Sequence, residues 1–264
     1  MDFIFQPPEQ PSKYSVKLET YNRESKFPYN ELTYTCTVQQ KKETLRGYIV
    51  NFKRSDLKLN RTNIHDPIDE IGLICGELLS DLDIGILPSG EILKIKNLSS
   101  IHEKWQNIKF KIEYTYLGDI VKGIVKNTEE NITDELRFID CLCRDQFFYN
   151  FICNIYGNLS DKISSESELP SFAGMGALKI KKRFTVDKNS NNGGQILTCA
   201  AVLSEETKHR LQAEKDTQDI EFIMTSEYSL SQDDRLIEAH VEQKFVVNNE
   251  LSAEQKVNII LETT

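Results

Sequence analysis

The chain has 264 residues and a formal net charge of −9, with 39% hydrophobic and 28% charged residues. Its 13 Phe and 10 Tyr exclude an intrinsically disordered chain, because disordered chains lack the aromatic residues that build a core. The acidic balance disfavours nucleic-acid partners unless basic residues gather locally. The nearest basic run alternates with apolar residues and is interpreted as the solvent-facing side of a strand: Lys179, Lys181, Lys182 and Arg183.

Residues 1–13 are predicted to form an extended arm, because they include Pro7, Pro8 and Pro11. They lack the basic start and the apolar run of about 7–15 residues that a secretory signal needs. No stretch reaches the roughly 18 consecutive apolar residues of a spanning helix, so we expect a cytoplasmic protein without a membrane span. The cysteines are expected to be reduced, buried thiols: Cys36, Cys75, Cys141, Cys143, Cys153 and Cys199.

Alternating apolar residues between Tyr14 and Leu59 predict half-buried antiparallel strands. The apolar runs cover residues 14–18, 32–38, 45–52 and 57–59. The polar residues Gln39–Glu43 suit a hairpin turn between the second run and the third.

Helices are predicted in the middle of the chain. Asp66-Pro67 is a typical helix start, and Gly72 and Gly76 on this helix are expected to admit a neighbouring element. After a hairpin over residues 82–95, which turns at Pro88-Ser89-Gly90, Ser100-x-x-Glu103 is interpreted as a capping box. The apolar stripe of that second helix is Ile101, Trp105, Ile108 and Ile112.

A third helix is predicted over Leu117–Val125, and a fourth from Thr133 to a stop at Gly157. A polar connector over residues 158–170 follows. Strands and one short helix are then expected at residues 178–186, 196–202, 204–214, 220–230, 236–247 and 257–261, with turns at Asn189–Gly194 and Asp233-Asp234.

This order predicts an α+β fold, with a curved antiparallel sheet from N- and C-terminal strands and a helical layer from the middle of the chain. We expect residues 14–264 to form a single domain, with a division near 158–170 as the alternative.

Chemistry-bearing motifs are absent from the sequence. The four histidines (His65, His102, His209 and His240) have no metal-like spacing, and no phosphate loop or Gly-x-Ser-x-Gly occurs. Cys141-x-Cys143 does not form one end of a zinc clamp, because helical residues two apart point in different directions. The segment Asp187–Gly193 lacks the glutamate of a calcium loop and is interpreted as a turn. We therefore expect no catalytic residues, no metal and no cofactor.

Two features favour binding. The aromatic cluster near the end of the fourth helix has more aromatic residues than one helical stripe needs. Together with Trp105 and the acidic turn Asp233-Asp234, this cluster is the candidate partner or ligand surface. These candidate residues are Trp105, Phe147, Phe148, Tyr149, Phe151, Tyr156, Asp233 and Asp234. The acidic segment 205–242 is expected to steer a basic protein partner.

The segment Pro88-Ser-Gly-Glu-Ile-Leu-Lys-Ile95 and the segment Tyr228–Phe245 resemble uncharacterised bacterial lipoprotein-type domains. The resemblance implies the half-barrel of lipoprotein carriers. The chain departs from that pattern in having no leader and no lipid-attachment cysteine, so no functional residues are carried over.

The expected function is a non-enzymatic protein-binding module of the immunity, adaptor or secretion-accessory type. One alternative is a carrier of an apolar small molecule, held in a sheet–helix cavity near Trp105, Phe147 and Phe151. The other is an enzyme of unfamiliar type that uses acidic residues such as Asp81 and Asp83.

Overall fold

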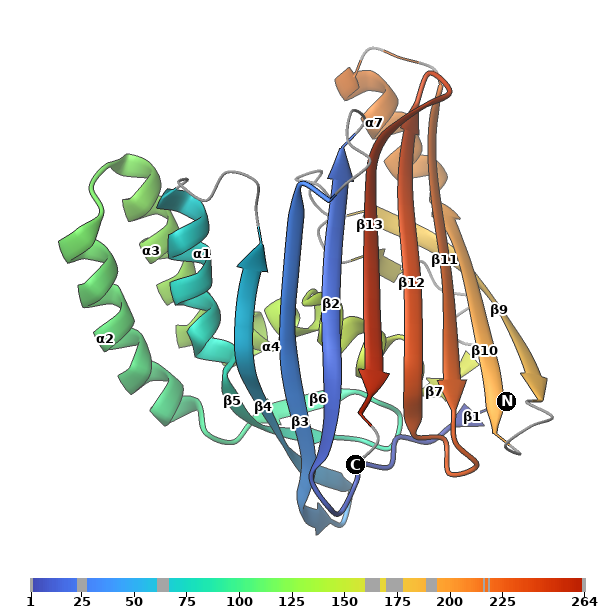
Figure 1. Ribbon diagram of the computed structural model, residues 1–264, viewed down its shortest axis with the longest axis horizontal. Helices are drawn as coiled ribbons and strands as arrows, with labels where there is room; N and C mark the ends of the chain where they lie inside the picture. Colours follow the sequence, from blue (N-terminus) through green and yellow to red (C-terminus); the bar gives the residue numbers. More distant parts are fainter. Residues whose placement is uncertain are drawn as a thin grey trace.

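The α+β class and the antiparallel sheet are confirmed. The computed structural model describes residues 2–22, 28–60, 67–159, 167–169, 178–188, 194–215, 217 and 219–262. Within these residues, eleven antiparallel strands form one sheet in the order β6-β5-β4-β3-β2-β13-β12-β11-β10-β9-β8 (Figure 1). The strands are β2 (Ser12–Asn22), β3 (Asn30–Thr44), β4 (Gly47–Asn60), β5 (Asp81–Ile86), β6 (Ile92–Ile95), β8 (Ser167–Leu169), β9 (Leu178–Lys188), β10 (Gln195–Leu203), β11 (Ile220–Leu230), β12 (Leu236–Val247) and β13 (Glu250–Leu261).

The two ends of the chain meet at the centre of this sheet. β2 pairs with β13, for example Val16 with Ile259 and Leu18 with Val257. Strands from the first sixty residues thereby continue directly into the strands from the last seventy. A hairpin from the middle of the chain, β5–β6, extends the sheet beyond β4.

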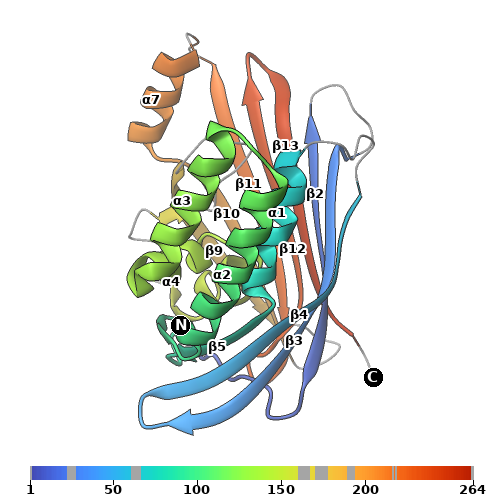
Figure 2. The same ribbon diagram turned by 90° about the vertical axis from the view of Figure 1, so that its left-hand side faces the viewer.

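Helices from the middle of the chain lie on one side of the sheet (Figure 2). They are α1 (Pro67–Gly76), η1 (Glu77–Leu79), α2 (Leu98–Thr115), α3 (Asp119–Thr133), α4 (Glu135–Cys143), α5 (Gln146–Phe148) and the π-helical turn η2 (Tyr149–Cys153). The short helix α7 (Glu205–Lys215) joins β10 to β11. As predicted, Ile101, Trp105, Ile108 and Ile112 form the buried stripe of α2.

The strands bury alternate residues, as their period of two requires. In β11, for example, Phe222, Met224, Ser226 and Tyr228 are buried, while the residues between them face solvent. These inward side chains and the helical stripes form one continuous core.

The turn predicted at Gln39–Glu43 is wrong. β3 continues to Thr44, and the chain turns at Leu45-Arg46 before β4, which runs without interruption through residues 57–59. Residues 41–46 are exposed, because this end of the β3–β4 ribbon extends past the core. Polarity therefore marks the end of burial here and not the end of the strand.

Three helical details also differ from the predictions. α2 begins at Leu98, so Ser100 is already helical, and the side chain of Asn97 instead bridges to β5 by accepting from Asp83 N and donating to Asp81 O. The predicted fourth helix breaks into α4, α5 and η2, because Asp145 caps a new helix start. No atom of the described residues approaches within 4 Å of a Cβ built on Gly72, so this glycine does not admit a neighbour.

The N-terminal segment packs against the body of the protein. Phe3 and Phe5 are buried, and β1 (Asp2–Phe3) pairs with β7 (Gly157–Asn158). Phe5 N donates to Pro88 O at 2.7 Å, which ties this segment to the β5–β6 turn. The predicted turn at residues 189–193, most of the connector 158–170 and His65 lie outside the described residues.

Candidate functional sites

The aromatic residues proposed as a partner surface lie in the core. Trp105, Phe147, Phe148, Tyr149, Phe151 and Tyr156 are all buried. Phe147 stacks on Phe151 with ring centroids 4.9 Å apart, and Phe52 meets Phe148 edge-on at 5.1 Å. The surface interpretation is wrong for these six residues, because the aromatic excess fills the space between the sheet and the helices. The same packing removes the support for an apolar carrier site lined by Trp105, Phe147 and Phe151.

Asp233 and Asp234 do form the predicted β11–β12 turn. Asp234, in the left-handed region at φ 58°, accepts from Ile4 N at 3.2 Å and from Gln195 Nε2 at 3.4 Å, so it fastens the N-terminal segment. Asp233 is exposed.

Four carboxylates of the acidic segment 205–242 are paired with basic side chains of this same chain. Ion pairs join Glu206 to Lys179, Glu214 to Arg210, Glu238 to His240, and Glu242 to Lys244 and Lys256. The segment also runs from α7 along β11 to the opposite end of the sheet (Figure 1). The expected basic partner therefore has no support in the geometry.

A different surface stands out on the helical side. Phe110, Tyr114, Leu117 and Ile120 are 70%, 83%, 90% and 67% exposed. They lie at the end of α2, in the connection and in the first turn of α3, and we call them the α2–α3 patch. The rings of Phe110 and Tyr114 stack with centroids 6.1 Å apart. Sequence reasoning missed the patch, although Phe110 and Tyr114 fall off the buried stripe of α2 in the helical periodicity.

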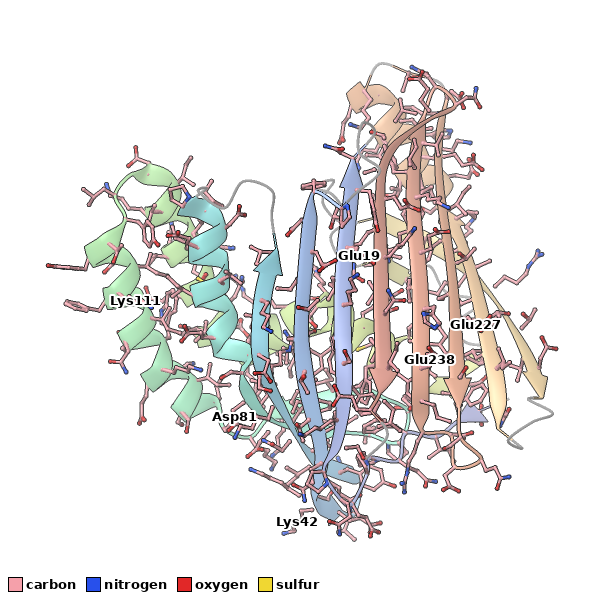
Figure 3. All side chains as sticks on the ribbon, viewed as in Figure 1. Glu19, Lys42, Asp81, Lys111, Glu227 and Glu238 are labelled. Carbon is pink, nitrogen blue, oxygen red and sulfur yellow. The ribbon has the colours of Figure 1, made fainter. Side chains whose placement is uncertain are left out.

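Lysines border the α2–α3 patch. Lys111 lies on α2 beside it (Figure 3) and forms no ion pair with a described residue. Lys122 pairs with Asp119 at 3.3 Å, but both side chains are so exposed that water screens the pair. The rim of this apolar patch therefore carries charges of both signs, because Glu113 and Asp119 are exposed beside the two lysines.

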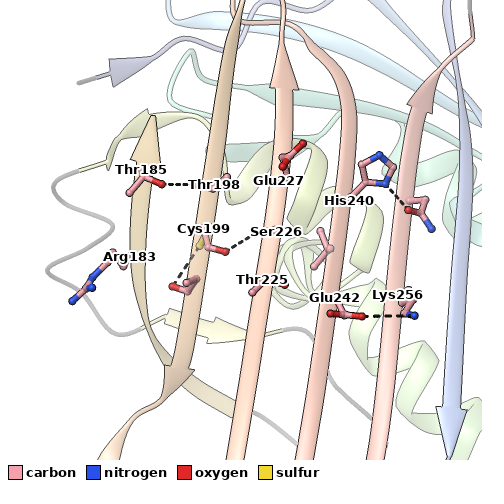
Figure 4. A pocket seen from close by; sticks show the side chains of 13 residues that line it. Arg183, Thr185, Thr198, Cys199, Thr225, Ser226, Glu227, His240, Glu242 and Lys256 are labelled. Carbon is pink, nitrogen blue, oxygen red and sulfur yellow. Dashed lines mark hydrogen bonds and ion pairs between the residues drawn. The ribbon is translucent and has the colours of Figure 1, made fainter. Parts of the chain in front are cut away.

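A shallow pocket of about 480 Å³ lies on the solvent-facing side of β9–β13 (Figure 4). The strand register builds it from two lateral rows: Arg183, Ala200, Thr225, Glu242 and Lys256 in one, and Thr185, Thr198, Glu227, His240 and Asn258 in the other. Small side chains form its floor, and the long charged ones form its rim.

The charges around this pocket mostly satisfy one another. Loss of water opposes the charge of His240, but the contacts with Asn258 and Glu238, each at 2.7 Å, raise the pKa of His240 above its ordinary value. Contact with Lys244, against some burial, lowers the pKa of Glu242. The pocket suits a neutral polar ligand better than a charged one.

A chain of polar side chains also runs through the core. Lys182 Nζ donates to Asn154 Oδ1 at 2.7 Å, Asn154 Nδ2 donates to the Tyr228 hydroxyl at 2.7 Å, and that hydroxyl donates to Asn150 Oδ1 at 3.0 Å. Burial lowers the pKa of Lys182 to about 8, against weaker opposing effects of Cys199 and Cys153. The predicted solvent-facing position of Lys182 is wrong, because its place in β9 turns it inward.

Among the described residues, no three His, Cys, Asp or Glu side chains gather closely enough to hold a metal ion. The paired carboxylates Asp81 and Asp83 both accept from the amide of Asn51, at 2.7 and 2.8 Å. Within the residues that the structure describes, no helix has both the length and the apolar character needed to cross a membrane.

Comparison with known protein families finds no match, and comparison with curated proteins finds none either.

Proposed function

We propose that this chain is a non-enzymatic protein-binding module and that the α2–α3 patch is its contact surface. The observation that carries the proposal is the exposure of four large apolar side chains at neighbouring positions. Water makes such a cluster unfavourable, and clusters of this kind mark interaction sites on folded proteins.

The chemistry of the patch favours one kind of partner. Two stacked aromatic rings supply large contact area at little cost in side-chain entropy. The charges of both signs at the rim favour a partner with polar residues around its apolar pocket. The connection between α2 and α3 lies at the outer side of the helices, away from the strands of the sheet (Figure 1), so a partner can approach it from the helical side.

This proposal includes a cytoplasmic setting and an immunity or adaptor role. It also keeps the curved sheet with one helical layer that the likeness to lipoprotein-carrier half-barrels implies. The buried thiols of Cys36 and Cys199 suit a reducing compartment. The helical layer supports the role by presenting the patch on a packed hairpin, since Ile108 and Ile112 anchor α2 in the core beneath it.

The test begins with a photo-crosslinking amino acid placed at position 114 in the native cell. The matched control places it at Leu136, which is 76% exposed but lies on α4. A protein captured only from position 114 is then purified, and its Kd is measured. We expect Phe110→Ala and Tyr114→Ala each to raise Kd about tenfold or more, and Leu136→Ala to leave it unchanged.

Three outcomes would overturn the proposal. They are equal crosslinking from both positions, an unchanged Kd in the Phe110→Ala/Tyr114→Ala double variant, and binding of the patch to lipid vesicles with no protein captured.

A further inference from the structure

A second surface concentrates positive charge on this acidic protein. A groove of about 990 Å³ lies between the exposed end of the β3–β4 ribbon and the β5–β6 hairpin. Four cations line it, Lys42, Arg46, Lys94 and Lys96, and Glu43 is the one carboxylate among its lining residues. We call it the β3–β6 groove.

The strand register explains the shape of the groove. Lys42 on β3 pairs with Ile49 on β4, Ile49 pairs with Gly85 on β5, and Gly85 pairs with Lys94 on β6. Directly paired residues of an antiparallel sheet share a face, so these four form one lateral row. The missing side chain of Gly85 leaves a low floor, with a lysine at each end of the row.

Gly47 lets the start of β4 approach the end of β5 closely. A Cβ on Gly47 would lie 2.2 Å from Ile86 O, so no larger residue fits there without moving β5. A Cβ on Gly85 would lie 3.3 Å from Lys94 Cγ, which is tight contact with the stem of the lysine that crosses it. Gly85 therefore keeps the floor low between the cationic side chains, and Gly47 lets β4 and β5 lie close together beside it.

The positive charges of the groove are not neutralised by described residues. No described carboxylate forms an ion pair with any of the four cations, whereas the neighbouring Lys41 is held by Asp83 at 2.8 Å. The pKa of Lys96 is lowered, chiefly by contact with Lys94 and further by some loss of water and by the charges of Lys94 and Lys42. The charge of Glu135 partly offsets this lowering. The lining of the groove brings these cations together from two separate hairpins.

Protection of a sheet edge does not account for this convergence. β6 ends the sheet, and lysines on an end strand discourage pairing with other chains. That role explains Lys94 and Lys96 only. Lys42 and Arg46 come from the β3–β4 ribbon, across the floor of Ile49 and Gly85, and an anion bound in the groove contacts cations from both hairpins.

We propose that the β3–β6 groove binds a phosphate-bearing ligand with at least two negative charges. Several point-charge amines and one forked guanidinium suit the many acceptor oxygens of phosphate better than a single carboxylate. Leu45 and Leu93, both exposed at the rim, accept an apolar substituent. The phosphate belongs either to a free anion or to a lipid headgroup, and the two sources are distinguished by experiment.

Pyrophosphate binding to the full chain is measured by calorimetry at about 50 mM salt, where screening is moderate. We expect Lys42→Gln combined with Lys94→Gln to weaken binding about tenfold or more. Lys58→Gln on the same ribbon, outside the groove lining, serves as the matched control and leaves Kd unchanged. Urea midpoints establish that the variants fold.

Cosedimentation with vesicles distinguishes the two sources of phosphate. Binding to phosphatidic acid vesicles but not to phosphatidylcholine vesicles, lost in the double variant, supports a headgroup. Binding of pyrophosphate alone supports a free anion. Failure of both probes, or equal weakening by Lys58→Gln, overturns the proposal. The α2–α3 patch is intact in these variants, so the outcome is independent of the protein-binding function.

Discussion

The guanidinium Nη2 of Arg54 on β4 lies 2.7 Å from the carboxylate Oδ1 of Asp145 at the start of α5. The same oxygen accepts from Phe147 N at 3.0 Å and Phe148 N at 3.2 Å. Burial opposes the charge of Arg54, but the Asp145 carboxylate raises the pKa of Arg54 above its ordinary value. One carboxylate thus holds a buried cation and caps the helix that carries the aromatic core.

Asp145→Ala is expected to destabilise the protein by about 3–5 kcal/mol, because it leaves Arg54 as a buried charge without its counter-ion. Urea unfolding measures the change. Asp140→Ala, which breaks the exposed 2.9 Å pair with Arg144, is the control and should cost about 0–1 kcal/mol. Equal losses in both variants would contradict this account.

Gly90→Ala is expected to cost at least about 1–3 kcal/mol. Gly90 has φ +80°, and a Cβ there would lie 2.8 Å from Ile152 O. Gly123→Ala on α3 meets open space and should instead stabilise the protein by up to about 1 kcal/mol. Thermal unfolding of the two variants should therefore shift in opposite directions, and a shift in the same direction argues against the turn geometry.

Lys182 makes stability depend on pH in the alkaline range. Its pKa is lowered from 10.5 to about 8 in the folded state, so between these values the unfolded chain binds more protons and stability rises with pH. The contribution of Lys182 to the free energy of unfolding is therefore lowest below pH 8. The full shift corresponds to roughly 3 kcal/mol.

The measurement compares the native chain with Lys182→Met by urea unfolding at several pH values. The difference between the free energies of unfolding, native chain minus Lys182→Met, should grow as pH rises from about 8 to about 10.5. The exposed neighbour Lys181→Met should retain the native slope. A flat difference for Lys182→Met would show that its amine is not desolvated.

Cys143 and Cys141 should differ in reactivity although both are partly buried. Cys153 Sγ lies 3.7 Å from Cys143 Sγ, and this contact lowers the pKa of Cys143, whereas burial raises the pKa of Cys141. Near pH 8 we expect iodoacetamide to modify Cys143 several-fold faster, because the thiolate is the nucleophile. Peptide mass spectrometry follows both sites. Cys153→Ala should abolish the difference, and its persistence would rule out the contact as the cause.

The aromatic residues show where sequence reasoning stops. The sequence places Phe147, Phe151 and Tyr156 on a crowded helical segment, and one stripe has no room for them. The structure resolves the crowding by breaking the helix at Asp145 and packing the rings against Phe52, Tyr14 and Phe5. These contacts join residues far apart in the sequence, so local periodicity cannot predict them.

Local pattern also identified the hairpin at Pro88-Ser89-Gly90, the Asp233-Asp234 turn and the buried stripe of α2. Period and turn chemistry are properties of neighbouring residues, so the sequence by itself determined an α+β protein with strands from both ends of the chain. Only the tertiary structure decided which side chains face water. The spacing of Phe110 and Tyr114 off the buried stripe of α2 is a signal in the sequence, but whether another element covers them depends on how the helices pack. The meeting of Lys42 with Lys94 depends on the register of four strands. That register follows from long-range pairing, which carries no signal in the spacing of residues along the chain.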